Sequence, residues 1–203
     1  MSLFLPTYFS PISQYMAIAQ SQEVIFEVED NFQKQTYRNR CYIYGPNGKQ
    51  LLNIPIKHLS GPQKKRTKDT LIDHDTPWQS QHVKSLQIAY RNSPFYEFYE
   101  DDLLPIFSKK HKFLVDLNID SYLFVTDALQ IDANYIKTAA YSNTALTDFR
   151  HLANAKKDVE VDFDRYVQVF DDKHSFIKNL SILDLLFMEG PNAISYLENA
   201  TIS

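Results

Sequence analysis

The 203-residue chain contains little cysteine, little glycine and no long apolar run. Cys41 is the only cysteine, which excludes a disulfide within the chain and a zinc site with several cysteine ligands. The 4 glycines are scattered and form no glycine-rich loop, so a phosphate would have to be bound by side chains or by a helix N-terminus. No stretch of about 18 apolar residues could span a membrane, and the first residues lack the pattern of a signal peptide. We therefore expect a cytoplasmic protein without a membrane span.

The composition is that of an ordinary globular protein. Hydrophobic residues make up 44% of the chain and charged residues 23%. A chain of 203 residues can bury one substantial core, so we expect a single domain over residues 1–203. The net charge of -4 argues against non-specific binding of nucleic acid. The expected partner is a small molecule or a sugar, and the sequence indicates no particular cofactor or oligomeric state.

The first half of the chain predicts an α/β fold. A strand at residues 3–5, a loop, a helix at 12–20 and a strand at 24–28 form a Rossmann-like opening. Two β-rich runs at 40–44 and 50–56 flank Gly45-Pro46-Asn47-Gly48, which predicts a β-hairpin. We expect these strands to form a mixed sheet.

In the second half of the chain, most apolar residues recur at the spacing of a helix. Helices are predicted from Trp78 to Tyr90, from Ser93 to Phe107 and over residues 112–129, and they would form a helical layer. Capping boxes are predicted at Thr76 and at Ser181, where the second would open an apolar helix ending at Gly190. Further short strands are predicted at residues 70–72, 134–139 and 166–170, and a last helix at 192–197.

A dense cluster of charges follows the strand at residues 24–28. If residues 34–40 are extended, Lys34, Arg38 and Arg40 share one face and could bind a phosphate or a carboxylate. The alternative is a surface on which these cations pair with Glu27, Glu29 and Asp30. The basic run at residues 64–68 has the same two interpretations, a solvated loop or an anion-binding loop.

His82 and Glu29 are the candidate catalytic residues. His82 lies one helical turn from Trp78, and a histidine with suitable neighbours is the commonest general base near neutral pH. The alternative is a hydrogen-bonded histidine in the core. Glu29 could contact a ligand or pair with a nearby cation. The other histidines show no metal-binding spacing, so no metal site is predicted.

Three other residues could contribute to a binding site. Asp148 and Arg150 could flank a ligand or pair with each other. Tyr8 lies in the loop after the first strand, a place that tends to line the ligand crevice of α/β sheets, although it could also fill a hole under the sheet. No G-x-S-x-G nucleophile motif is present.

Eight segments carry a resemblance to a known family, and this resemblance covers most of the chain, from about Leu5 to Leu197. They are LPTYFSPISQY, NFQKQTYRNR, NGKQLLNIPI, HVKSLQIAYRNSPFYEFY, LVDLN, DFRH, YVQVF and NLSILDLLFMEGP. In order and spacing they resemble the bacterial WbqC-like proteins. The matching positions are Tyr8, Glu29, Lys34, Asn39, Arg40, His82 and Tyr90, together with Asp148, Arg150 and Gln168. The chain departs from many members at Leu5-Pro6, which replaces Gln-Pro, and is shorter between Ser142 and Tyr166.

The resemblance implies a role in the biosynthesis of bacterial surface polysaccharide such as O-antigen. An aminoacyl (glycine) or acyl transferase acting on a sugar is the leading hypothesis. Lys34, Arg38 and Arg40 would then hold an anionic donor, and His82 would deprotonate the attacking group. The alternatives are a nucleotide-binding or nucleotidyl-transfer domain and a non-enzymatic binding or assembly protein of a glycan pathway.

Overall fold

The computed structural model describes residues 1–57, 65–141, 147–157, 159 and 161–199. Its central element is a parallel sheet with the strand order β5-β2-β1-β6. The strands are β1 (Ser2–Phe4), β2 (Val24–Phe26), β5 (Tyr135–Lys137) and β6 (Thr147–Asp148). β1, the helix α1 (Ile12–Ala19) and β2 follow one another, and Leu3 pairs in parallel with Ile25. The α/β fold with a Rossmann-like opening is therefore confirmed.

The predicted hairpin is also confirmed and forms a two-stranded sheet of its own. β3 (Arg40–Gly45) pairs with the antiparallel β4 (Gly48–Asn53). Gly48 has φ +94°, a left-handed conformation that glycine adopts without the steric cost of a side chain. The parallel and antiparallel pairings are thus separated into two sheets.

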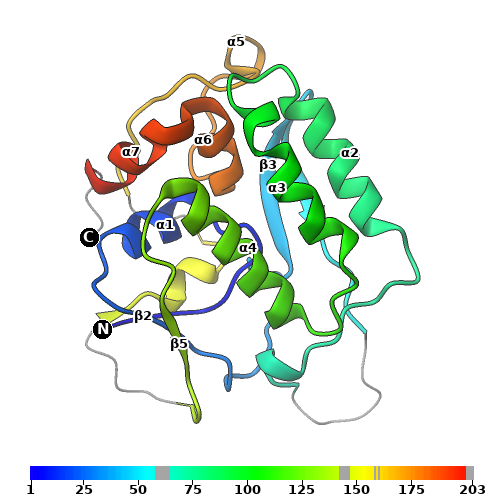
Figure 1. Cartoon of the computed structure of the whole chain (residues 1–203), viewed down its shortest axis with the longest axis vertical. Helices are drawn as coiled ribbons and strands as arrows, with labels where there is room; N and C mark the ends of the chain where they lie inside the picture. The colour runs from blue at the N-terminus through cyan, green and yellow to red at the C-terminus, as the bar shows by residue number, and fades with distance from the viewer. Residues whose placement is uncertain (58–64, 142–146, 158, 160, 200–203) are drawn as a thin grey trace.

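Most of the helices lie in two groups (Figure 1). The α-helices are α2 (Trp78–Tyr90), α3 (Tyr96–Ser108), α4 (Leu114–Leu129), α5 (Asp171–His174), α6 (Ile182–Glu189) and α7 (Ala193–Asn199). The 3-10 helices are η1 (Thr67–Asp69), η2 (Arg150–Ala153) and η3 (Gly190–Asn192). α2 and α3 lie beside the hairpin, α1, α6 and α7 lie together on the other side, and α4 lies between the groups. Within the described part of the chain, no helix has the length and apolar character that a membrane span requires.

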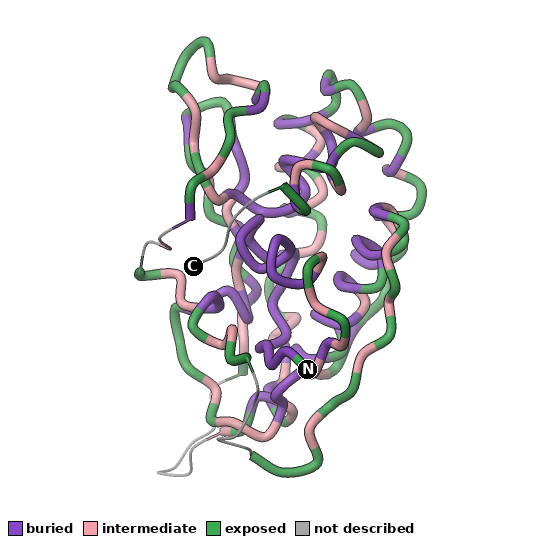
Figure 2. Tube along the Cα trace, turned by 90° about the vertical axis from the view of Figure 1, so that its left-hand side faces the viewer, coloured by how far each residue is buried: buried purple, intermediate pink, exposed green. Residues whose placement is uncertain are grey.

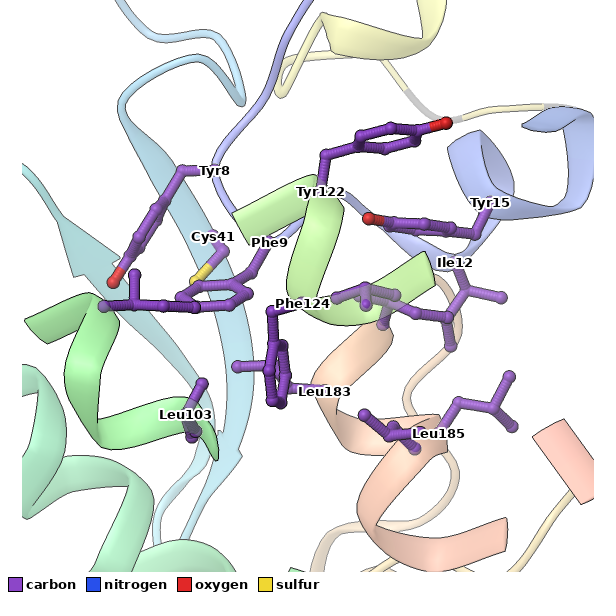
Figure 3. Close-up of a cluster of buried hydrophobic side chains, with 14 of the residues drawn as sticks. Tyr8, Phe9, Ile12, Tyr15, Cys41, Leu103, Tyr122, Phe124, Leu183 and Leu185 are labelled. Atoms are coloured by element: carbon purple, nitrogen blue, oxygen red, sulfur yellow. The ribbon is translucent and has the colours of Figure 1, made fainter. Parts of the chain in front are cut away.

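The hydrophobic core connects both sheets with the helices. Buried segments run through the middle of the molecule in Figure 2, with the exposed ones outside. Tyr122 of α4 packs edge-on against Phe26 of β2 and Tyr135 of β5, with ring centroids 5.0 and 5.8 Å away. Figure 3 shows side chains of the loop after β1, of α4 and of α6 in one buried cluster.

Three predicted local features are wrong. Residues 70–72 form only isolated bridges, because their backbone groups bond to Lys57, Lys112 and Leu114 rather than to one partner strand. Residues 166–170 form no strand, since the side chains of Tyr166 and Gln168, rather than backbone pairing, fix this segment. Thr76 does not cap α2: the helix begins at Trp78, as predicted, but its N-cap is Pro77 and no side chain forms a cap hydrogen bond.

The N-terminus of α6 differs from the prediction in an informative way. Ser181 accepts a hydrogen bond from the Leu183 N–H, as a cap should. Asp184 does not complete the capping box, because its fully buried carboxylate accepts hydrogen bonds from Tyr90, Tyr166 and Gln168 at 2.6, 2.5 and 2.9 Å. Burial raises the pKa of Asp184, and these three donors oppose the rise.

The Asp184 carboxylate links α6 to the hairpin through one tyrosine. The Tyr90 hydroxyl, at the end of α2, donates to Asp184 and accepts the backbone N–H of Tyr44 in β3 at 2.9 Å. A single buried network therefore joins α2, β3, α6 and the segment that contains Tyr166.

Replacing Asp184 should destabilise the protein strongly. Asp184→Ala leaves three buried donors without an acceptor, so the free energy of unfolding should fall by about 3 to 5 kcal/mol. Urea unfolding followed by circular dichroism measures the change. Asp101→Ala, at an exposed position on α3, is the matched control and should change stability by no more than about 0.5 kcal/mol. A loss below about 1 kcal/mol for Asp184→Ala would show that the network is not important for stability.

Candidate functional site

A cavity of about 530 Å³ lies at the carboxyl edge of the parallel sheet. Because all four strands run in the same direction, their carboxyl ends meet at this edge. Leu5 follows β1, Glu29 follows β2, Tyr141 follows β5 and Arg150 follows β6, and all four residues line the cavity. The remaining lining residues are Asp30, Asn31, Gln33, Thr36, Arg38, Arg66, His151, Ala153 and Asn154. Open α/β sheets bind ligands in the crevice at this edge.

Backbone hydrogen bonds hold the walls of the cavity together. The turn at residues 33–38 is joined to η2, since the Tyr37 N–H donates to the Ala153 carbonyl at 2.9 Å and Thr36 bridges to Asn154. The segment after β2 is joined to η1, since the Thr67 N–H donates to the Asp30 carbonyl at 2.9 Å. Segments distant in sequence thus form one concave surface.

Arg38 forms the floor of the cavity and is only 1% exposed. Its guanidinium forms an ion pair with Asp30 and donates to the Thr36 hydroxyl at 3.2 Å. Asp30 also accepts a hydrogen bond from the Thr67 hydroxyl at 2.5 Å. Burial lowers the pKa of Arg38, whereas the charge of Asp30 acts against this, and a guanidinium remains protonated in proteins.

Glu29 holds two cations on one wall. Its two carboxylate oxygens accept hydrogen bonds from Lys68 and Arg66, each at 2.6 Å. The hydrogen bond from Lys68, supported by that from Arg66, lowers the pKa of Glu29. The Arg66 side chain is 55% exposed, so part of its guanidinium stays accessible to a ligand.

Arg150 also lines the cavity and forms a fork-like ion pair. Its Nε and Nη2 donate to the two carboxylate oxygens of Asp148 at 3.0 and 2.7 Å. The hydrogen bond to Arg150 lowers the pKa of Asp148, and the same contact raises the pKa of Arg150. The guanidinium carbon also lies 5.5 Å from the ring centroid of Tyr141, in a cation–π contact.

Three arginines in the cavity are therefore each fixed by their own carboxylate. Such groups are ordered before a ligand arrives, which reduces the entropic cost of binding. Guanidinium groups recognise carboxylates and phosphates through parallel hydrogen bonds. The cavity is suited to a polar ligand with an anionic group.

The N-terminus of α1 is closed, although Rossmann-type proteins bind phosphate at the corresponding position. The Ile12 N–H donates to the Leu180 carbonyl at 2.9 Å, and the Ser13 N–H donates to the Asn179 side chain at 3.0 Å. The N-terminus of α1 is therefore not open to a phosphate, and at this edge of the sheet the side chains of the cavity are the candidate phosphate-binding groups.

Of the predicted site residues, the structure brings Glu29, Arg38 and Arg150 together in the cavity. Asp148 anchors Arg150 from outside the lining. The structure shows the ion pairs that the sequence left open as alternatives. Asp148 pairs with Arg150, and Glu29 pairs with nearby cations. Of the basic run, Arg66 lines the cavity and Lys68 bonds to Glu29, while Lys64 lies outside the described residues.

The predicted face of three cations does not form, because residues 34–39 turn instead of extending. Gln35 adopts φ +61°, which ends any regular alternation of side chains. Lys34 is exposed in the turn, Arg38 is buried, and Arg40 begins β3. Asn39 holds the hairpin, since its side-chain amide donates to the Ile54 carbonyl at 3.0 Å.

Tyr8 and His82 lie in the core, bonded to each other. Tyr8 is fully buried among the side chains in Figure 3, and its hydroxyl donates to His82 Nδ1 at 2.9 Å. His82 Nε2–H donates to the Asn53 carbonyl at 3.2 Å, so both ring nitrogens are engaged. Burial lowers the pKa of His82 to about 4, so the ring is neutral near pH 7. Tyr90 is likewise committed to the core, through Asp184.

The sequence did not single out His151 or the amides that line the cavity. Asn31 and Gln33 fall inside the charge cluster, but an amide in a polar stretch gives no local signal of a site. Asn154 and His151 reach the cavity only because η2 docks on the turn at residues 33–38. The DFRH segment was the one indication that this region contributes.

His82 should make the stability of the protein depend on pH. Its pKa is about 4 in the folded state and about 6.5 when unfolded, so the unfolded state binds the extra proton. The contribution is complete above pH 6.5 and is lost as the pH falls toward 4. Between pH 7.5 and 5 we expect a loss of about 2 kcal/mol in the free energy of unfolding.

Urea unfolding of wild type and His82→Gln at both pH values measures this contribution. The variant should be less stable at pH 7.5 and should show a smaller loss at pH 5. His151→Gln, at an exposed position, is the control and should keep the wild-type pH dependence. An equal pH dependence in wild type and His82→Gln would contradict the assignment.

Comparisons with known proteins agree with the resemblance seen in the sequence. The model of the WbqC-like protein family matches residues 6–162, a range that contains every cavity residue named above except Leu5. An uncharacterized protein of Mycobacterium tuberculosis, Rv1507c, is 28% identical over 208 residues, which cover 89% of this chain and 89% of that protein. No solved structure matches the chain. The chain belongs to the WbqC-like protein family.

Proposed function

We propose that the protein is a transferase of bacterial surface-polysaccharide biosynthesis, such as that of O-antigen, which moves an aminoacyl or acyl group onto a sugar. The observation that carries this proposal is the convergence of Arg38, Arg66 and Arg150 in one cavity at the carboxyl edge of the sheet. Family membership supports the pathway, and the preordered guanidinium groups support an anionic substrate or donor.

We assign the general base to His151 instead of His82. His151 is exposed and lines the cavity, whereas both nitrogens of His82 are engaged in the core. In the proposed step, His151 takes the proton of an acceptor hydroxyl or amine while that atom bonds to the acyl carbon of an activated ester or thioester. The bond from the acyl carbon to the leaving group breaks, and the leaving group departs with the electron pair.

The nucleotidyl-transfer alternative receives less support from the same geometry. A nucleotide bound as in Rossmann-type folds would need the N-terminus of α1, which Leu180 and Asn179 already cover.

The proposal predicts that Arg150 contributes to ligand binding and not to folding. A thermal-shift screen against acyl-CoAs, nucleotide sugars, sugar acids and glycine identifies ligands of the wild type. Arg150→Ala should weaken the binding of any anionic ligand so found by about 10- to 100-fold, because it removes hydrogen bonds from a charged group. Its melting temperature should stay close to that of wild type, since the carboxylate of its partner Asp148 is exposed and can be solvated by water.

Arg91→Ala is the matched control, because Arg91 is exposed at the end of α2 and does not line the cavity. It should bind ligand as the wild type does. Equal binding by wild type and Arg150→Ala would contradict the assignment of the site.

His151 should matter for turnover. With an active donor and acceptor pair, mass spectrometry follows the mass that the acceptor gains. His151→Ala should lower the rate by about 100- to 10,000-fold while ligand binding persists. If His82→Gln lowers the rate and His151→Ala does not, at equal folded fraction, the general base is His82 and the assignment of His151 is wrong.

A further inference from the structure

We infer that the arginine cavity binds a sugar acid, that is, a monosaccharide ring with a single carboxylate, and not a nucleoside diphosphate or triphosphate. The inference rests on the proposed function and names the substrate class of the same site. Three features of the described residues support it: the charge balance, the uncommitted amides and the aromatic ring at the rim.

The charge balance matches one negative charge. The described cavity residues and their ion partners include four cations, Arg38, Arg66, Lys68 and Arg150, and three carboxylates, Glu29, Asp30 and Asp148. The surplus is one positive charge. A diphosphate or triphosphate carries several negative charges, and the carboxylates that fix the arginines would repel them. One carboxylate could pair with the exposed part of the Arg66 guanidinium without this cost.

The side-chain amides of the cavity offer both donors and acceptors, which match the hydroxyl groups of a sugar better than the oxygens of a phosphate. Asn31 and Gln33 line the cavity, and no hydrogen bond of their side chains is found among the described residues. The side-chain oxygen of Asn154 accepts the Lys156 N–H at 3.0 Å, which leaves its NH₂ group for a ligand. An amide both donates and accepts, and so does a sugar hydroxyl, whereas an ionised phosphate only accepts. The amide oxygens would therefore have no partner on a phosphate.

Tyr141 could pack against the ring of the sugar. Its side chain is 55% exposed and lies beside Arg150 at the rim of the cavity. A pyranose has an apolar face of C–H groups that can cover an aromatic ring, while its carboxylate reaches the neighbouring guanidinium. The same ring and cation would thus recognise two parts of one ligand.

The size of the cavity leaves space for a second substrate. A volume of about 530 Å³ lies within the usual range for small-molecule sites. A single sugar ring would fill only part of it, so an acyl donor could enter beside the sugar, near His151. The arrangement is that required of a transferase with the sugar acid as acceptor.

Calorimetric titration of the full chain with galacturonate, glucuronate, galactose and UDP tests the inference. Galacturonate or glucuronate should bind at least about tenfold more tightly than galactose, because only the acids can pair with a guanidinium. They should also bind more tightly than UDP. Equal affinity for galactose would overturn the inference, as would tighter binding of UDP.

A double variant tests the amides independently of the charges. Asn31→Ala combined with Gln33→Ala should weaken galacturonate binding by about tenfold or more. Gln81→Ala, at an exposed position on α2, is the control and should bind as the wild type does. An unchanged affinity in the double variant, with an intact fold by circular dichroism, would overturn the role of the amides.

The two proposals fail in distinguishable ways. If UDP binds and Arg150→Ala abolishes that binding, the cavity is an anion site but the sugar-acid inference is wrong. If acyl transfer occurs onto a neutral sugar, the transferase stands and the inference again fails. If none of the probes binds and no donor supports transfer, both proposals are wrong.

Discussion

The buried ion pair between Arg38 and Asp30 is the contact on which the carboxyl edge of the sheet depends. Asp30 lies in the segment after β2, and Arg38 lies in the turn that follows it. The hydroxyl of Thr67 in η1 donates to the Asp30 carboxylate. The backbone carbonyl of Arg38 accepts a hydrogen bond from Asn118 of α4 at 2.9 Å, and Asn118 also donates to the Pro6 carbonyl at 3.0 Å. The ion pair and these hydrogen bonds together connect the segments that follow β1 and β2 with η1 and α4 at the edge of the cavity.

A charge pair of this kind is a costly means of stabilising a fold. Removing a guanidinium and a carboxylate from water often costs as much as their attraction returns, and apolar residues could fill the same space. Its place at the floor of a polar cavity accords with a role in recognition. Two other arginines of the cavity are also held by a carboxylate: Arg150 bonds to Asp148, and Arg66 bonds to Glu29. Each guanidinium is fixed before binding, so the entropic cost of ordering it belongs to folding and does not weaken ligand binding.

Much of the fold could be predicted from local patterns in the sequence. The β-α-β opening, the hairpin at Gly48 and the helices from Trp78 onward follow from apolar spacing and turn residues, and the structure confirms them. The segment 166–170 was predicted to be a strand from its β-branched and aromatic residues. Its side chains do alternate, but Tyr166 and Gln168 thereby reach Asp184, and the backbone pairs with no other strand of the described chain.

The site was predictable only where charge concentrates. Glu29 and Arg38 stood out in the charge cluster after the predicted strand at residues 24–28, Arg150 stood out beside Asp148, and all three line the cavity. Gln35 has a left-handed backbone that nothing in its residue type indicates, so the turn that buries Arg38 could not be foreseen. Helical spacing placed His82 beside Trp78 but could not tell whether the ring faced the core or a ligand. The closure of α1 by residues 179 and 180 joins segments too far apart in sequence for any local pattern to indicate.

The central claim is that carboxylate-anchored arginines at this edge of the sheet bind an anionic ligand. The most direct measurement is a nuclear magnetic resonance titration of the arginine Nε–H groups with galacturonate, with each signal assigned by substitution. The account predicts that the signals of Arg66 and Arg150 shift in a saturable way while that of Arg91 does not move. Shifts confined to arginines outside the cavity, or the absence of any saturable shift with galacturonate or with any anion found in the thermal-shift screen, would contradict it.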